Sequence, residues 1–185
     1  MRKWLWVCVA LSLGGLWYLK QKQAHPELPI LQTITSFSLL DDTDQVFTEK
    51  QLIGKPCIVN FMFTQCQGPC PLMIQRMAIL ARSPELEKLQ FLSITMDPAH
   101  DRPEVLRAYK KEKQLEGLSW KFLTGDQPAV ISLATQVFKV AAGSDPEMHS
   151  TRLILVDAKG NVRGYYDSQE AVSMEKLTVE AKQLL

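Results

Sequence analysis

The feature that most restricts the fold of this chain is the continuous apolar run CIVNFMF, from Cys57 to Phe63. A strand with one wet face would alternate apolar and polar residues, and this run does not. Such a run is typical of a central strand that is covered on both faces, as in layered α/β proteins. We therefore expect Cys57–Phe63 to lie at the centre of a sheet with helices on either side.

The segments around this run supply the other layers of the expected fold. FSLLDDTDQVF predicts a small hairpin that leads into the domain. Apolar periodicity predicts strands at 91–97 and 119–125, helices at 72–82, 103–114 and 128–140, a hairpin at 151–167 and a closing helix at 173–184. This order predicts a thioredoxin-like α/β sandwich, whose final hairpin gives an otherwise parallel sheet its antiparallel edge.

The N-terminal segment does not belong to that core. Its apolar run from Trp4 to Leu19 follows two basic residues and would span about 24 Å as a helix at ~1.5 Å per residue. Aromatic residues stand at both ends of the run, as is favoured at membrane interfaces. We predict an uncleaved transmembrane anchor at 1–20, a linker at 21–35 and the α/β domain at 36–185. A cleaved signal peptide is the alternative.

The net charge and the N-terminal sequence indicate which classes of partner and which cellular compartment to expect. The formal net charge is +1, so neither nucleic acid nor a strongly anionic partner is expected. No long Arg- and Ser-rich presequence is visible, which favours a bacterial envelope protein over a mitochondrial one. We expect the domain to lie in the periplasm, held at the inner (cytoplasmic) membrane by its anchor. Thiol pairs can be oxidised in that compartment.

Two cysteines, Cys66 and Cys70, directly follow the apolar run. Side chains four positions apart share one face at the start of a helix, so both sulfur atoms can point the same way. The unpaired N–H groups of a helix start favour the thiolate, which is both the nucleophile of disulfide exchange and the form that binds metals. A redox pair and a metal site therefore both fit. A structural disulfide here would close too short a loop to contribute much stability.

His149 is the third candidate, on the loop that precedes the strand expected from 152. Ligands in open α/β sheets gather at the carboxyl ends of strands, where the two thiols fall. In thioredoxin-like folds the loop before that late strand faces the thiol loop. Two thiolates and one imidazole form a soft set that suits copper as Cu(I) or Cu(II), whereas structural zinc takes four ligands. On the pattern alone, a solvent-exposed loop histidine is the alternative reading.

Other candidate residues are better explained by packing or by turns. Cys57 lies inside the expected central strand, and Met73 and Met77 fit the buried face of a helix. His100 is expected to be solvated in a turn. Asp97 could accept a proton near the thiols, with a turn residue before proline as the alternative.

Four stretches of the chain resemble, as an ordered set, the Sco/SenC family of copper-binding assembly factors for cytochrome c oxidase. They are KPCIVNFMFTQCQGPCP, LSITMDPAHDRPEVLRAYKK, SWKFLTGD and MHSTRLILVDAKGNV. The resemblance runs from about Phe37 to the end. It implies one copper ion, bound by the residues that match Cys66, Cys70 and His149. It also implies delivery of copper to the dinuclear site of oxidase subunit II, or reduction of that site's cysteines.

Two other functions are open on this reading. One is a membrane-tethered thiol–disulfide oxidoreductase that acts on a partner protein through the same Cys66 and Cys70. The other is a peroxidase of the peroxiredoxin or glutathione peroxidase type, which shares the fold. Thioredoxins and peroxiredoxins usually place a proline immediately before the late strand, and here Ser150 and Thr151 stand there instead. This difference favours copper handling. Family members often have an acidic residue between the thiols, where this chain has Gln67-Gly68-Pro69, which bears on the balance between copper carrier and reductase.

Overall fold

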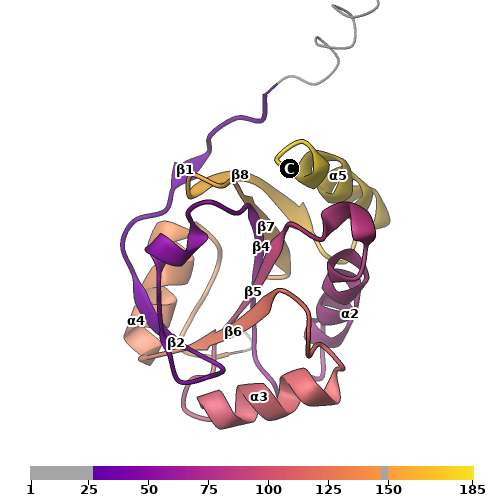
Figure 1. Cartoon of the computed structure of the whole chain (residues 1–185). Coiled ribbons are helices and arrows are strands. Elements are labelled where there is room, and N and C mark those ends of the chain that lie inside the picture. The colour runs from indigo at the N-terminus through magenta and orange to yellow at the C-terminus, as the bar shows by residue number, and fades with distance from the viewer. Residues whose placement is uncertain (1–26, 147–149) are drawn as a thin grey trace, which may run out of the picture.

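A computed structural model describes residues 27–146 and 150–185 (Figure 1). The predicted anchor, residues 21–26 of the predicted linker and His149 lie outside these residues. Strands in the described part are β1 (Gln32–Thr33), β2 (Ser38–Asp41), β3 (Val46–Thr48), β4 (Cys57–Met62), β5 (Gln90–Thr95), β6 (Trp120–Thr124), β7 (Arg152–Val156) and β8 (Asn161–Asp167). Helices there are α2 (Cys70–Ala81), α3 (Pro103–Glu112), α4 (Gln127–Ser132) and α5 (Ala171–Lys182), with short 3₁₀ turns η1 (Glu49–Leu52) and η2 (Pro84–Leu86) and a π-helical turn η3 (Leu133–Val137).

The strands form one mixed sheet in the order β1-β8-β7-β4-β5-β6-β2-β3. β4 lies inside the sheet, parallel to β5 and antiparallel to β7. The final hairpin, β7–β8, confirms the predicted antiparallel addition. The sheet differs from the expectation at its other end, where β2 pairs antiparallel with β6 and carries β3 with it. The parallel part is therefore only the central trio of β4, β5 and β6.

Residues near the end of the expected linker also join the sheet. β1 pairs with β8 through Gln32 opposite Val162, and the side chain of Ile34 is buried. The strand contributes only two residues. Ile34, which directly follows β1, stabilises the packing of this segment against the sheet, because its burial removes apolar surface from water.

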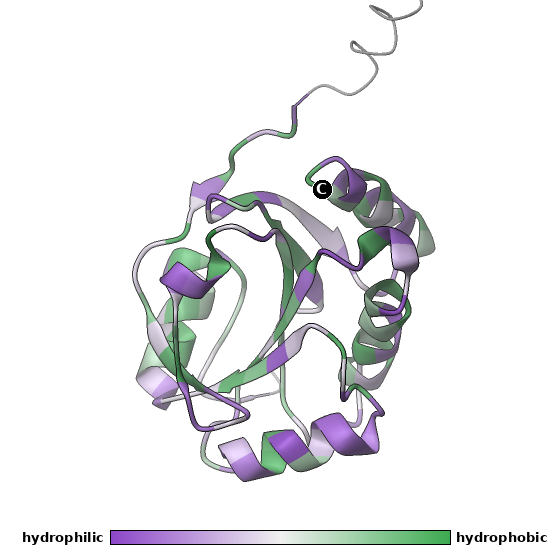
Figure 2. Cartoon of the chain, in the orientation of Figure 1, coloured by the Kyte–Doolittle hydropathy of each residue, from purple (hydrophilic) through white to green (hydrophobic). Residues whose placement is uncertain are grey.

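Two hydrophobic cores explain why the run in β4 has no wet face. Ile58 and Met62 point into the core beneath α2, α3 and α5, whereas Val59 and Phe61 point into the core beneath α4. Figure 2 shows apolar colour along the central strands between these two helical layers. Asn60 is the polar exception. It accepts a hydrogen bond from the hydroxyl of Ser93 at 2.6 Å within the buried sheet.

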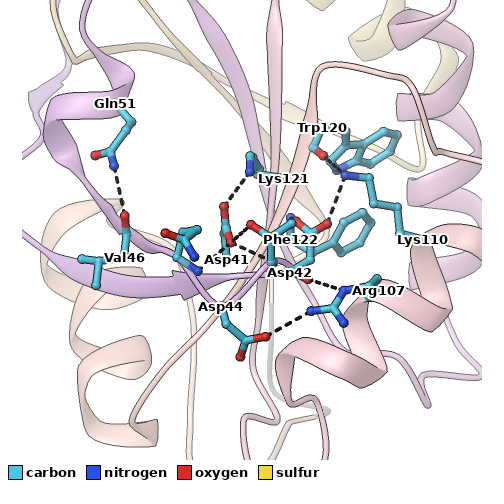
Figure 3. A network of polar contacts seen from close by, with 12 residues as sticks. Asp41, Asp42, Asp44, Val46, Gln51, Arg107, Lys110, Trp120, Lys121 and Phe122 are labelled. Carbon is cyan, nitrogen blue, oxygen red and sulfur yellow. Dashed lines mark hydrogen bonds and ion pairs between the residues drawn. The ribbon is translucent and has the colours of Figure 1, made fainter.

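The carboxylates of the β2–β3 turn fasten this edge hairpin to β6 and α3 (Figure 3). Asp41 accepts hydrogen bonds from the backbone N–H of Thr43 at 2.8 Å and of Gln45 at 3.1 Å, and from Lys121 Nζ at 2.6 Å. Asp42 accepts hydrogen bonds from Lys110 Nζ and from the backbone N–H of Phe122, both at 3.1 Å. The carboxylates of Asp41 and Asp42 therefore have a structural role: they hold the β2–β3 hairpin against β6 and α3.

The environment of Asp41 predicts a pH dependence of stability. Burial alone would raise the pKa of this carboxyl, but the hydrogen bonds from Lys121, Thr43 and Gln45 outweigh it and lower the pKa to about 2. Because the folded-state pKa lies below the unfolded one, the stabilisation is present above about pH 4 and is lost as the pH falls through 2.

We expect Asp41→Asn to lower the free energy of unfolding at pH 7 by about 2 kcal/mol, measured by urea denaturation. The difference from wild type should shrink as the pH approaches 2. Asp44→Asn is the matched control, because Asp44 is exposed and contacts only Arg107 among the described side chains. A constant gap between wild type and Asp41→Asn across this pH range would contradict the assignment.

Candidate functional site

The two thiols lie at the carboxyl end of β4. The chain turns after Phe63, where the N–H of Cys66 donates to the carbonyl of Phe63 at 3.3 Å. Cys70 is the first residue of α2, with a proline after it in the first turn. The turn and the helix start bring the side chains of Cys66 and Cys70 into hydrogen-bond contact, and no disulfide joins them. The structure thus confirms that the two sulfur atoms meet.

The two sulfur atoms have different surroundings. Cys70 is 1% exposed, whereas Cys66 is partly exposed at the surface. Burial raises the pKa of the Cys70 thiol to about 12; a backbone hydrogen bond at Phe63 opposes this rise, and Cys66 and Asp101 add to it. The helix start was expected to favour a thiolate, but loss of hydration at Cys70 outweighs it. A metal ion bound to this sulfur must therefore displace a proton.

A buried carboxylate, Asp101, holds the turn that leads to the thiols. Its side chain is fully buried and accepts hydrogen bonds from the backbone N–H of Thr64 at 2.9 Å, from the Thr64 hydroxyl, and from the Thr95 hydroxyl at 2.5 Å. No cationic side chain in the described part of the chain pairs with it. Asp101 thus connects the segment after β4 to the end of β5. Its contact on the β4 side is Thr64, which lies two residues before Cys66.

Asp101, and not Asp97, is the aspartate of this segment that holds the turn before the thiols, and the sequence pattern did not single it out. Asp97 forms a turn, in which its carboxylate meets the exposed His100 at 2.7 Å. Its backbone N–H donates to Thr95 at 3.0 Å. These contacts support the alternative reading of Asp97 as a turn residue. Asp101 follows four positions later, two residues before Pro103, and no local pattern marks it as the aspartate that is buried.

The start of β7 lies at the same edge of the sheet as the thiol loop. β7 runs antiparallel to β4 with Val59 opposite Ile154, so Thr151 falls level with Met62, the last residue of β4, and Ser150 falls level with Phe63. The carbonyl of Thr151 accepts from the N–H of Ser168 at 3.2 Å. Arg76 of α2 donates to the carbonyl of Ser168. The segment that directly follows His149 is therefore connected to the helix that Cys70 begins.

The remaining sequence candidates are structural in the described part of the chain. Met73 and Met77 are fully buried in the core, as expected. Cys57 is fully buried in β4, and burial, followed by the charge of Asp157, raises the pKa of its thiol. Apart from His149, which is not described, no group of three or more Cys, His, Asp and Glu side chains is placed to hold a metal ion. Within the same residues, no helix is long and apolar enough to cross a membrane.

Comparison with known proteins agrees with this architecture. A model of the SCO1/SenC family matches residues 27–185. A SCO1/SenC family lipoprotein from Bacillus anthracis has a TM-score of 0.76 at 28% identity, over 84% of this chain and 96% of that one. BsSco, a member of the Sco family of cytochrome c oxidase assembly proteins with an identified disulfide switch, gives 0.74 at 25%, over 85% and 96%. Yeast Sco1 with copper bound gives 0.68 at 27%, over 83% and 91%.

The role of Asp101 can be tested without any metal. We expect Asp101→Ala to lower the free energy of unfolding by about 3 kcal/mol, because the N–H of Thr64 and the buried hydroxyl of Thr95 lose their acceptor. Hydrogen exchange at the Thr64 amide should accelerate more than exchange in β4. Asp97→Ala is the matched control and should cost less than about 1 kcal/mol, since the side-chain partner of its carboxylate is the exposed His100. Unchanged exchange at Thr64 in Asp101→Ala would show that the carboxylate does not hold the turn.

Proposed function

The chain belongs to the SCO1/SenC family, and we propose that it is a copper chaperone whose cargo is held by Cys66, Cys70 and His149. We further propose that it delivers copper to the binuclear copper site of cytochrome c oxidase subunit II during assembly. Copper is bound in the structure of yeast Sco1, and BsSco is a member of a family of cytochrome c oxidase assembly proteins. The observation that carries the proposal is the contact between the sulfur atoms of Cys66 and Cys70.

The donor set fits copper better than the other common metals. Thiolate is a soft ligand that favours Cu(I), and imidazole suits several oxidation states and metals, copper included. A site with two sulfur ligands and one nitrogen ligand is a low-coordination site, which suits a carrier that must hand its copper to other ligands. The partly exposed Cys66 offers an incoming ligand a way to reach the ion, while the buried Cys70 protects the ion from water on its other side.

The fold supports His149 as the third ligand through the position of the segment that follows it. Ser150 and Thr151 fall level with Phe63 and Met62 at the carboxyl end of β4, and Thr151 is connected through Ser168 to α2. His149 precedes these residues in the chain by one and two positions. We therefore propose His149 as the third ligand, because the residue that follows it in the chain lies at the edge of the sheet that carries the thiols.

The location that we propose follows from the sequence and the relatives together. Residues 1–20 are proposed to anchor the chain in the inner membrane, with the domain in the periplasm. A similar protein from Bacillus anthracis is a lipoprotein. A lipid group would attach that protein to a membrane, where we propose a transmembrane segment for this chain. A copper carrier that is anchored in the membrane stays close to a membrane-bound acceptor.

A second candidate function is reduction of a partner's disulfide, favoured by the unequal exposure of the two thiols. The thiolate of Cys66 would attack one sulfur of the target disulfide and form a mixed disulfide, releasing the other target sulfur as a thiol after protonation. The thiolate of Cys70 would then attack Cys66, releasing the second target thiol. The target gains two electrons and two protons, and the chain ends with a Cys66–Cys70 disulfide.

We expect full-length chain, reduced and loaded with Cu(I), to retain about one copper after exhaustive dialysis against a moderate chelator. Cys66→Ser and Cys70→Ser should each lose nearly all of it, because a single remaining thiolate with an imidazole binds Cu(I) far more weakly. His149→Ala should keep the fold and release copper at least tenfold faster. Elemental analysis and circular dichroism of the same samples provide the two readouts.

Two matched controls separate site residues from general effects. Cys57→Ala removes a thiol that lies in the core, and His100→Ala removes an exposed histidine next to a different turn. Both should retain copper at the wild-type level. Near-normal copper in Cys66→Ser or Cys70→Ser would refute the assignment, and wild-type release from His149→Ala would remove the histidine from the site.

The reductase function predicts different results for the two cysteine variants, whereas the copper site predicts that both lose copper. When metal-free chain is mixed with an oxidised peptide that holds a Cys-x-x-x-Cys disulfide, Cys70→Ser should accumulate a mixed disulfide at Cys66, visible by mass spectrometry. Cys66→Ser should accumulate little, because the sulfur of Cys70 is buried. Equal adducts on both variants, or none on either, would count against the oxidoreductase role.

A further inference from the structure

We propose that the end of the domain opposite the thiol loop lies against the anionic lipid surface of the membrane, so that the thiols face away from the bilayer. This inference rests on the proposed anchor. The surface, here called the basal pole, surrounds the β7–β8 turn. The residues on which the argument depends are Ile30, Leu31, Ile53, Lys55, Lys159 and Leu185.

The described chain begins at the basal pole. Glu27 and Leu28 border one hollow together with Lys159 of the β7–β8 turn, and Leu31 donates its N–H to the carbonyl of Val162 at 2.9 Å. Figure 1 shows the C-terminus at the same end of the molecule. The anchor would therefore join the domain beside the β7–β8 turn and the chain end.

The thiol loop lies at the other end of β4. Cys57, the first residue of the strand, pairs with Val156, next to the β7–β8 turn. The thiols follow the last residue of the strand, Met62, so a six-residue strand separates the two ends, about 20 Å at ~3.3 Å per residue. Orientation of the basal pole toward the membrane thus fixes the thiols on the outward side.

Large apolar side chains are exposed around this pole. Ile30 is 61% exposed and Ile53 is 58% exposed. Leu31 and Leu185 are exposed as well. Ile53 lies against the turn, with its Cδ1 at 3.4 Å from the position that a Cβ on Gly160 would occupy. Exposed apolar residues that gather on one surface indicate a contact with another surface.

The lysines of the basal pole suit a bilayer with anionic lipids. Lys55 and Lys159 are exposed, and neither forms an ion pair with a carboxylate of the described chain. Each borders a hollow of the pole, the first beside Leu185 and the second beside Ile30. Acidic and further basic residues border the same hollows: Glu27, Asp157 and Arg163 the hollow of Lys159, and Glu87 and Lys88 the hollow of Lys55. Basic side chains close to a membrane are attracted to anionic headgroups over roughly one Debye length.

The proposed linker is too short for the opposite orientation. Residues 21–26 connect Lys20, where the proposed anchor ends, to Glu27, and they extend over at most about 25 Å. A domain of this size has a diameter of about 40 Å. To bring the thiol loop onto the same bilayer, the linker would have to pass along the whole domain. The domain can tilt on its linker, but the thiol end cannot replace the basal pole at the membrane.

The experiment uses the full chain, labelled with nitrogen-15, in nanodiscs of phosphatidylethanolamine and phosphatidylglycerol. A small fraction of lipid carries a gadolinium chelate on its headgroup, which broadens nearby amide signals. We expect several-fold stronger broadening at Ile30, Ile53 and Lys159 than at Val105 and Val172. These two controls are also exposed apolar residues, at the starts of α3 and α5, near the carboxyl ends of the central strands.

A charge variant supplies the second arm of the test. Lys55→Gln combined with Lys159→Gln should reduce broadening at Ile53, and so should neutral phosphatidylcholine in place of phosphatidylglycerol. Lys111→Gln on α3 is the matched control and should change nothing. Equal broadening at Ile53 and Val172, strongest broadening at Gln67 of the thiol loop, or failure of the chain to enter nanodiscs would each overturn the inference. Copper retention in the same samples reports the proposed function separately.

Discussion

The antiparallel pairing of β4 with β7 is the constraint on which the rest of this structure depends. β4 delivers the thiol loop to its carboxyl end, and an antiparallel neighbour must begin where β4 finishes. If the start of β7 lay at the basal pole instead, β7 would have to run in the opposite direction, and the pairing of buried Val59 with Ile154 would be lost. A one-residue slip would already turn their side chains toward the wrong core. Two segments that lie about 80 residues apart in the sequence therefore meet at one edge.

The thiol loop itself is held by polar contacts, because a turn at the edge of a sheet buries little apolar surface. Asp101 supplies these contacts from the segment after β5, with Thr64 and Thr95 as its partners. A buried carboxylate without a cation is costly unless several donors satisfy it. Here three donors from two strand ends do so, and they make the geometry of the turn part of the folded core. The thiols can then differ in exposure, which suits both copper transfer and ordered thiol exchange.

Much of the fold could be predicted from local signals in the sequence. The unbroken apolar run gave β4 its central place, Pro103 marked the start of α3, and Met73 and Met77 followed the buried face of α2. The pairing of β2 with β6 was not predictable, since nothing in FSLLDDTDQVF specifies which edge the hairpin joins. Asp101 was missed for a related reason. Its role depends on Thr64, which lies 37 residues earlier in the chain, and no local pattern reports a partner at that separation.

The most direct test of the central claim is X-ray absorption at the copper edge on full-length chain loaded with Cu(I). The account predicts a first shell of two sulfur atoms and one nitrogen atom, with the outer-shell scattering that is typical of an imidazole ring. That scattering should vanish in His149→Ala while both sulfur contributions stay. A shell made of sulfur alone, or an imidazole signal that survives loss of His149, would contradict the account.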